Sequence, residues 1–468
     1  MNSIRRVMAH STSRVANPAI WCLLLAVLIN VPTAAPAQSI KISGEVKSSI
    51  RARVDNGYNV GIIVGVVDQQ GTRYFSYGET EFGNGITPDE NSVFEIGSIS
   101  KVFTSILLAD MIARGEVKLD DPIQLYLPDG VTAPTRSERS ITPYDLATHT
   151  SGLPRMPNNF SPADATNPYA DYTVAQMYEF LDGYTLRRDI GSQYEYSNFG
   201  AGLLGNLLAS AAGMTYEDLI EQRITSVLGM DDTSIELTPD QQRRLATGHV
   251  GTMAVPNWDI PALAGAGALR STTADMLEFV AANAGLEETR LHAVLSSTHE
   301  PRETAGAPSM QIGLGWHIRS GEGVAAVWHN GGTGGYRSFA GFVQDGNTGV
   351  VVLTNSNRST DDIGFHLLNP SFPLGEVRAM VQVAPEVLRR YVGEYELTPA
   401  LIFDVQLEGE RLTVQLTGQS RLPVYAESET KFFYTVVDAQ ITFEVDERGE
   451  VAALVLHQNG MDQRARRR

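Results

Sequence analysis

Three short polar motifs, far apart in the chain but in a fixed order, constrain the fold more than any other feature of the sequence. They are Ser98-Ile99-Ser100-Lys101, Tyr196-Ser197-Asn198 and His329-Asn330-Gly331. A serine hydroxyl is a weak nucleophile at neutral pH and needs a base within hydrogen-bond reach. Three residues along a helix place two side chains on the same face, one turn apart. The motifs therefore predict a nucleophilic site to which all three contribute, with Lys101 as the candidate base for Ser98.

The residues after Ser98 have the pattern of a helix. Apolar residues recur at Phe103, Leu107 and Met111, and Gly115 ends the run. A serine at the start of a helix lies near the positive end of the helix dipole, which favours an oxyanion nearby. The alternative is that Ser98 only caps the helix and that Lys101 is a solvated surface lysine. The presence of the other two motifs argues against that alternative.

A second serine–lysine pair, Ser428 and Lys431, has the same spacing but a different context. It leads into residues 432–437, a run of aromatic and β-branched residues that is typical of a strand. The two side chains would not share a helical face there. The context therefore excludes this pair as a second site.

The second and third motifs carry side chains that can bind or protonate a substrate. Tyr196 offers a phenol and Asn198 an amide, and glycines surround the third motif at positions 331, 332, 334 and 335. Glycine in a strand often marks close approach of the backbone to a ligand. Taken singly, Tyr196 has the alternative interpretation of a half-buried aromatic, Asn198 of a turn or cap residue, and His329 of a structural histidine.

These motifs resemble those of the penicillin-recognising serine hydrolases, in the branch that holds class C β-lactamases, DD-carboxypeptidases, D-aminopeptidases and related esterases. The resemblance covers roughly residues 50–365. It also includes the segments FEIG at 94–97, LATHTSGLP at 146–154 and GAGALRST at 265–272. It implies that Ser98 is the acylated nucleophile and Lys101 its base. The backbone N–H groups of Ser98 and Gly332 would form the oxyanion hole.

The same resemblance implies roles for the remaining motif residues. Tyr196 would serve as the acid and base for the leaving group and the deacylating water, and Asn198 would bind a substrate amide. His329 and Gly331 would line the edge strand against which the substrate lies. The resemblance implies neither a cofactor nor a metal.

One position departs from the pattern of the resembling enzymes. Class C β-lactamases usually carry lysine where His329 stands, as a fixed cation for a substrate carboxylate. A histidine with an ordinary pKa of about 6.5 is mostly neutral at pH 7. We therefore expect neutral esters to be better substrates than penicillins at pH 7 to 8. Protonation of His329 below roughly pH 6 would then favour anionic substrates.

The expected function is that of a serine acyl hydrolase acting through a covalent acyl-enzyme on amide or ester bonds, with a small-molecule or peptide substrate. D-amino-acid peptides or small esters are the preferred substrate classes, and a class C-like β-lactamase is the first alternative. The second alternative is a non-catalytic penicillin-binding or interaction protein. The joint presence of Ser98, Lys101 and Tyr196 argues against it.

Other chemistries lack their signatures in this sequence. None of the five lysines follows a glycine, which excludes a P-loop, and no Gly-x-Ser-x-Gly elbow indicates an α/β-hydrolase. The histidines stand singly and the only cysteine is Cys22, so we expect no metal site and no disulfide. A net charge of −18 at pH 7 argues against nucleic acid as a partner.

The N-terminal 37 residues have the pattern of a secretory signal. A basic start with three arginines precedes an apolar core at 19–31, and small residues at 35–37 suit cleavage. The apolar core is too short for an ordinary membrane-spanning helix. We therefore expect a mature periplasmic or secreted protein that begins near Gln38 and has no stable membrane span. An uncleaved membrane anchor is the alternative.

Two domains are expected after the signal. Residues 38–375 would form an α+β domain of the β-lactamase/transpeptidase type, in which strands from both ends build one antiparallel sheet and a helical subdomain lies between them. Those strands are expected at 60–67, 73–77, 316–318, 325–328, 339–343 and 349–353. The boundary lies near two prolines, Pro370 and Pro373.

Residues 385–468 carry short alternating segments that predict a small antiparallel β-barrel. The expected strands are 402–407, 411–416, 431–437, 440–445 and 451–457. This region resembles the lipocalin-like domains appended to several of these hydrolases. It could cap the cleft or act as a stabilising or oligomerising appendage, and the oligomeric state stays open. We expect the arginines at 464 and 466–468 to form a frayed basic tail.

Overall fold

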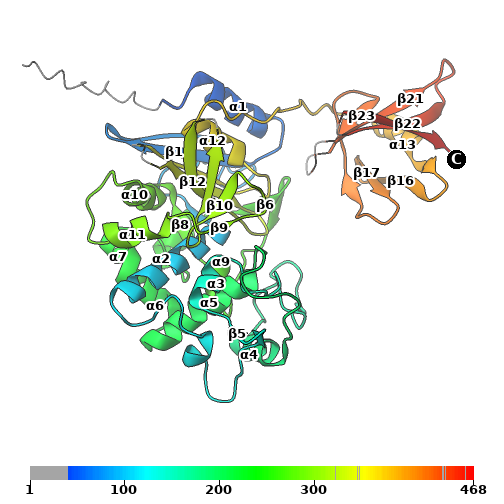
Figure 1. The fold of residues 1–468 in the computed structure, drawn as a ribbon. Coiled ribbons are helices and arrows are strands. Elements are labelled where there is room, and N and C mark those ends of the chain that lie inside the picture. Colours follow the sequence, from blue (N-terminus) through cyan, green and yellow to red (C-terminus); the bar gives the residue numbers. More distant parts are fainter. Residues whose placement is uncertain are drawn as a thin grey trace, which may run out of the picture. The chain divides into compact units, whose positions relative to one another are not determined.

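The computed structural model describes residues 41–468, apart from residues 322, 345, 347, 435, 436, 438 and 459. The expected signal at 1–37 lies outside the described residues. Within the described part, no helix combines the length and apolar character that crossing a bilayer requires. Two large antiparallel sheets, one of eight strands and one of nine, organise the chain (Figure 1).

The eight-stranded sheet has the order β2-β1-β14-β13-β12-β11-β10-β9. Its strands are β1 Gly61–Asp68, β2 Gly71–Gly78, β9 Glu303–Thr304, β10 Met310–Ile312, β11 His317–Gly321, β12 Val324–Gly332, β13 Arg337–Val343 and β14 Thr348–Thr354. β1 pairs with β2 on one side and with β14 on the other, so the two ends of the domain meet in one sheet. This confirms the expected hairpin and the α+β fold class.

β1 shows why the sheet is buried on both faces. Every residue of this strand is buried, and its apolar residues alternate between two cores. Ile63 and Val67 face the larger core, which includes α10 (Thr273–Asn283). Ile62, Val64 and Val66 face a smaller core with α1 (Gly44–Asp55) and α12 (Asp361–Leu368), so helices cover both faces (Figure 1).

A mainly helical region lies between β2 and β9 in the chain, as expected. Its helices are α2 Ser100–Ala113, α3 Pro143–Ala147, α4 Val174–Gly183, α5 Asn198–Ala212, α6 Tyr216–Ile220, α7 Ser226–Leu228, α8 Pro239–Arg244, α9 Ala264–Gly267, α10 and α11 His292–Thr298. α2 is buried along nearly its whole length, and its buried residues include Lys101 as well as the apolar side chains of a central helix. It ends where Gly115 adopts φ +75°, in agreement with the sequence analysis.

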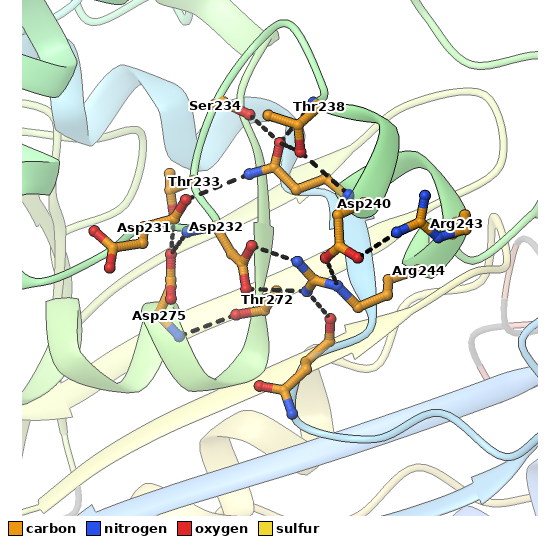
Figure 2. A network of polar contacts seen from close by, with 12 residues as sticks. Asp231, Asp232, Thr233, Ser234, Thr238, Asp240, Arg243, Arg244, Thr272 and Asp275 are labelled. Atoms are coloured by element: carbon orange, nitrogen blue, oxygen red, sulfur yellow. Dashed lines mark hydrogen bonds and ion pairs between the residues drawn. The ribbon is translucent and has the colours of Figure 1, made fainter.

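A short strand pair carries the chain into the start of α2. β3 (Val93–Glu95) pairs antiparallel with β8 (Arg270–Thr272). The polar network in Figure 2 anchors this pair: the Thr272 hydroxyl accepts a hydrogen bond from Asp275 N at 3.1 Å, and the Asp275 carboxylate accepts from Thr233 at 2.8 Å. Arg244 of α8 joins the same network through Asp232. β3, which precedes Ser98, is therefore held by β8, and β8 is in turn held by the network that includes Asp232 and Arg244.

The C-terminal region is one antiparallel sheet of nine strands that forms a nearly closed barrel, with the order β18-β17-β16-β15-β23-β22-β21-β20-β19. The strands are β15 Gly393–Thr398, β16 Leu401–Glu408, β17 Arg411–Leu416, β18 Leu422–Pro423, β19 Tyr425–Ala426, β20 Lys431–Phe433, β21 Ala439–Val445, β22 Val451–Gln458 and β23 Met461–Arg467. Helix α13 (Pro385–Tyr391) packs Leu388 and Tyr391 into the core of this sheet. The barrel expectation is confirmed.

The prediction of a frayed basic tail was wrong. The tail is β23, which pairs with β22 and β15. Ala465 is fully buried in the barrel core, whereas Arg464 reaches Glu444 at 2.7 Å and Arg468 reaches Glu396 at 2.8 Å. Arg464 and Arg468 thus lie over acidic residues of β21 and β15.

Candidate active site

Ser98 lies in a single 3₁₀ turn, Gly97–Ile99, immediately before α2. The helix therefore begins two residues later than its sequence pattern predicted. Gly97 has φ +50°, and a Cβ atom on it would lie 2.7 Å from the backbone nitrogen of Gly332. Only glycine permits so close an approach. The turn that carries Ser98, called the nucleophile turn below after the role expected for Ser98, is consequently held against the end of β12. Ser98 remains partly exposed while its neighbours are buried.

Lys101 is in the position that a base for Ser98 requires. Its Nζ atom lies 2.9 Å from Ser98 Oγ and donates a hydrogen bond to the carbonyl oxygen of Ala266 at 2.6 Å. The side chain is almost completely buried. Burial, and to a smaller extent the charge of Arg155, holds the pKa of Lys101 well below its usual value. A neutral amine with a free lone pair is therefore accessible to this residue, as general-base catalysis demands.

Tyr196 lies beside the same pair of residues. The centre of its ring is 4.9 Å from Lys101 Nζ. Burial raises the pKa of Tyr196 to about 12, although a hydrogen bond with Ser98 and the charge of Arg155 act in the opposite direction. The phenol consequently keeps its proton at neutral pH. A protonated phenol is suited to donating a proton to a leaving group. Lys101, whose pKa is lowered, is therefore the stronger candidate for accepting the proton of Ser98.

His149 is a residue of this site that the sequence analysis did not single out. Its Nδ1 atom accepts a hydrogen bond from Ser197 N at 3.2 Å, and its ring centre lies 4.6 Å from that of Tyr196. Its backbone has φ +59°, a strained conformation for a residue other than glycine that persists when the surroundings fix it. Burial keeps the pKa of His149 well below its usual value, so Nδ1 stays available as an acceptor. The LATHTSGLP segment at 146–154, which contains His149, was the signal in the sequence that could have identified this residue.

Asn198 begins α5 and faces a small pocket of about 140 Å³. The pocket is also lined by Ser98, Gly97 and Gly332. The Asn198 Nδ2 atom lies 3.8 Å from a methionine sulfur, and its buried Oδ1 atom has no hydrogen-bond partner among the described residues. A buried amide oxygen without a partner is costly. A donor on a bound molecule, such as a substrate N–H, would satisfy it.

His329 of β12 is buried rather than exposed to the pocket. Only 1% of its surface is exposed, its Nδ1 atom lies 2.6 Å from the carbonyl oxygen of Asn330, and its ring centre is 6.3 Å from that of Tyr196. Burial, followed by the charges of His317 and Lys101, holds the pKa of His329 well below its usual value. The sequence analysis predicted that His329 becomes protonated below roughly pH 6. That prediction is corrected to a lower pH, because burial in the folded chain disfavours the charged imidazolium ring.

His317 of β11 completes this group and was also missed in the sequence. Its ring centre lies 5.0 Å from that of His329, and its Nε2 atom lies 3.0 Å from the hydroxyl of Tyr194. Burial lowers the pKa of His317 to about 4. The histidines around Lys101 are thus neutral at physiological pH and add no positive charge to the site.

Gly331 is fixed by the closest backbone approach in the site. A Cβ atom on Gly331 would lie 1.9 Å from the carbonyl oxygen of Ile96 and 2.3 Å from Ser338 Oγ. The next residue, Gly332, is exposed and lines the pocket with Ser98. The strand therefore brings the Gly332 backbone next to the nucleophile, where an oxyanion hole is expected.

Gly331→Ala should lower kcat/KM by about 100-fold or more, because the strand must move away from the nucleophile turn and such misplacement is costly in catalysis. Steady-state kinetics would measure the loss, and circular dichroism would check the fold. Gly321→Ala is the matched control: Gly321 lies on β11 of the same sheet, and its Cβ would meet no atom within 4 Å. Wild-type kinetics in Gly331→Ala would contradict the close contact.

The chain matches two family models: one described as "Beta-lactamase" over residues 46–366, and one described as a "Domain of unknown function (DUF3471)" over residues 378–467. The D-alanyl-D-alanine-carboxypeptidase/endopeptidase AmpH of Escherichia coli K12 is 33% identical over 312 residues, which cover 63% of this chain and 80% of that protein. Penicillin-binding protein 4* of Bacillus subtilis is 26% identical over 426 residues, which cover 84% of this chain and 91% of that protein.

Solved structures show the same fold. A β-lactamase/D-alanine carboxypeptidase from Yersinia pestis, complexed with citrate, has a TM-score of 0.59 and 27% identity, and covers 67% of this chain and 94% of that one. A class C β-lactamase from Rhodobacter sphaeroides has a TM-score of 0.61 at 22% identity, over 70% of this chain and 99% of that one. Together with the Ser98–Lys101 geometry, these matches show that the chain belongs to the β-lactamase family and is a serine hydrolase.

Proposed function

We propose that Ser98 forms a covalent acyl-enzyme with peptides that contain D-amino acids or with small esters. The observation that carries this proposal is the 2.9 Å approach of a buried lysine amine to the Ser98 hydroxyl at the edge of a pocket. The relatives named as D-alanyl-D-alanine carboxypeptidases support the peptide class. Relatives named as β-lactamases keep penicillin hydrolysis as the second candidate.

The mechanism follows from the proton affinities of the site. Neutral Lys101 accepts the proton of Ser98 as its oxygen attacks the substrate carbonyl. The backbone N–H groups of Ser98 and Gly332 donate to the oxyanion, which is the main source of stabilisation in such sites. Tyr196 gives its proton to the leaving amine or alcohol and is reprotonated from Lys101. A water molecule then attacks the ester bond of the acyl-enzyme. Lys101 and Tyr196 take the proton of this water and return a proton to the Ser98 oxygen, which releases the carboxylic acid and restores Ser98.

Asn198 and the strand residues hold the substrate in this scheme. Asn198 Oδ1, which has no partner among the described residues, would accept a hydrogen bond from a substrate amide. His329 and Gly331 shape the wall beside Tyr196 and the nucleophile turn. No residue cluster in the described part of the chain has the composition of a metal site, and the scheme uses protein groups and one water molecule.

We also propose the domain division and address that the sequence predicted. Residues 1–37 would direct export, residues 38–375 would form the hydrolase domain, and residues 385–468 would form the appended β-domain. The ranges of the two family matches agree with a boundary between residues 366 and 378. Mass spectrometry of the exported chain, with Gln38 as the expected first residue, would test the cleavage and the periplasmic or secreted location.

A fluorescent phosphonate and a fluorescent penicillin test the proposed function directly. We expect the phosphonate to add one adduct per chain, seen by intact mass, and peptide mapping to place it on Ser98. Hydrolysis of a D-alanyl-D-alanine peptide and of a nitrophenyl ester would then rank the two substrate classes. A chain that takes no adduct and hydrolyses neither substrate would be the non-catalytic alternative.

His329→Lys should raise kcat/KM for penicillins relative to neutral esters at pH 7.5, since we expect the longer lysine side chain to carry its ammonium group beyond the buried position of the imidazole and toward the pocket. In the wild type, the same ratio should not show the change near pH 6 to 7 that protonation of an ordinary histidine would cause, because burial holds the pKa of His329 well below its usual value. His329→Gln is the matched neutral control and should leave the ratio near that of the wild type. An unchanged ratio in His329→Lys would show that this position does not select substrates.

A further inference from the structure

Arg155 is the one charged residue among those that line the pocket at Ser98. Its side chain is exposed, and the guanidinium carbon lies 5.1 Å from the centre of the Tyr196 ring. Within the described residues, the guanidinium has no ion pair, and the lining of the pocket contains no carboxylate. The positive charge next to the reacting groups is therefore available to a molecule that enters the pocket.

The backbone of Arg155 is fixed to the catalytic segment. Its carbonyl oxygen accepts hydrogen bonds from Asn198 N at 3.0 Å and Phe199 N at 3.2 Å, at the first residues of α5. The preceding Pro154 accepts a further bond from the Ser197 hydroxyl at 2.6 Å. The arginine is thus presented from a loop that is tied to the motif carrying Tyr196 and Asn198.

No other side chain that lines the pocket carries a cation, and the guanidinium of Arg337, which lies against Gly332, donates through Nη1 to the carbonyl oxygens of Thr333 and Tyr336. Lys101 is buried and has a lowered pKa, and its Nζ atom is already engaged by Ser98 and Ala266. The pKa values of His149, His317 and His329 are also lowered by burial. Arginine, in contrast, stays protonated at all working pH values and can grip a carboxylate through two parallel hydrogen bonds.

We propose that Arg155 is a specificity-determining residue that binds a carboxylate of the substrate. It would supply the fixed cation that class C β-lactamases carry at the position of His329. Here the cation would come from the loop that is hydrogen-bonded to the start of α5, and not from β12. This inference rests on the proposed function, since it assigns the charge of the substrate on which Ser98 acts. The preferred substrates are then acyl compounds with a free carboxylate close to the scissile bond, in place of the neutral esters that the uncharged His329 alone led us to expect.

Two substrate pairs test this role, each differing in one charge. The first is a D-alanyl-D-alanine peptide with a free C-terminus and its C-terminal amide. The second is the nitrophenyl monoester of glutaric acid and nitrophenyl butyrate. In Arg155→Gln, we expect kcat/KM for the anionic member of at least one pair to fall about 10- to 100-fold, mainly through KM, with a change below about threefold for its neutral partner.

Arg155→Lys should keep part of the preference, because it retains the charge but not the two-point geometry. Arg290→Gln is the matched control, since Arg290 is an exposed arginine outside the pocket lining. Its kinetics should equal those of the wild type. Phosphonate labelling of Ser98 should persist in all three variants, because the neutral probe does not need the cation.

Three results would overturn the proposal. Unchanged selectivity in Arg155→Gln for both pairs would do so, with labelling of Ser98 showing that the proposed function itself still holds. An equal loss in kcat for charged and neutral substrates, with the pH profile moved to higher pH, would show that Arg155 acts only by lowering the pKa of Lys101. Absence of labelling and turnover in the wild type would instead reject the proposed function on which the inference rests.

Discussion

Replacing Ser98 with alanine should abolish covalent labelling by a phosphonate and lower turnover by several orders of magnitude. Among the described residues, the two hydrogen-bond partners of Lys101 Nζ are the Ser98 hydroxyl at 2.9 Å and the backbone carbonyl of Ala266 at 2.6 Å, and a carbonyl oxygen cannot replace the hydroxyl as the nucleophile. Loss of the nucleophile in a serine hydrolase typically costs about 10⁴- to 10⁶-fold in kcat. Intact-mass analysis after labelling and single-turnover kinetics would measure the two effects.

The structure also provides the control for this experiment. Ser428 precedes Lys431 with the same spacing, but its Oγ atom accepts hydrogen bonds from the backbone N–H groups of Thr430 at 3.4 Å and Lys431 at 3.0 Å, in the turn before β20. Ser428→Ala should therefore label and turn over as the wild type does. Ser98→Ala should keep its melting temperature, because the lost hydroxyl is partly exposed. Labelling that persists in Ser98→Ala would place the nucleophile elsewhere.

The core of the site could be predicted because its signals are local. Ser98 and Lys101 are three residues apart, and both a 3₁₀ turn and an α-helix bring such residues together. The later start of α2 thus left their contact intact. Glycines at 331 and 332 likewise marked a close backbone approach, although the atom that Gly331 approaches, the carbonyl oxygen of Ile96, could be known only from the structure.

Residues whose roles depend on contacts between distant segments escaped prediction. His149 acts through Ser197, 48 positions later, and His317 matters because β11 lies next to β12. The charge state of His329 depends on burial, which a single histidine in a sequence does not reveal. The strand β23 was misjudged for a related reason: Ala465 is the only buried residue of that strand, so no apolar alternation announces it.

Lys101→Arg should be nearly inactive although it keeps the positive charge. A guanidinium does not lose its proton in a protein, so it cannot accept the proton of Ser98. We expect kcat/KM to fall at least 10³-fold, and acylation by the phosphonate to slow in parallel. Because Lys101 is almost completely buried, the larger side chain could disturb packing, so Lys101→Met serves as a second variant of similar length without a base. Thermal unfolding would verify that both variants fold.

The pH dependence of the wild type provides an independent measure of the same role. The base must be unprotonated, so kcat/KM should be low in acid and rise as Lys101 loses its proton; burial places this midpoint well below the usual lysine pKa of about 10.4. Lys101→Cys, alkylated with bromoethylamine, restores an amine that is a weaker base, and should regain activity with the midpoint moved to lower pH. Activity near that of the wild type in Lys101→Arg would reject Lys101 as the base. The proton of Ser98 would then have to go to Tyr196, whose raised pKa of about 12 keeps it protonated and makes it the poorer acceptor at neutral pH.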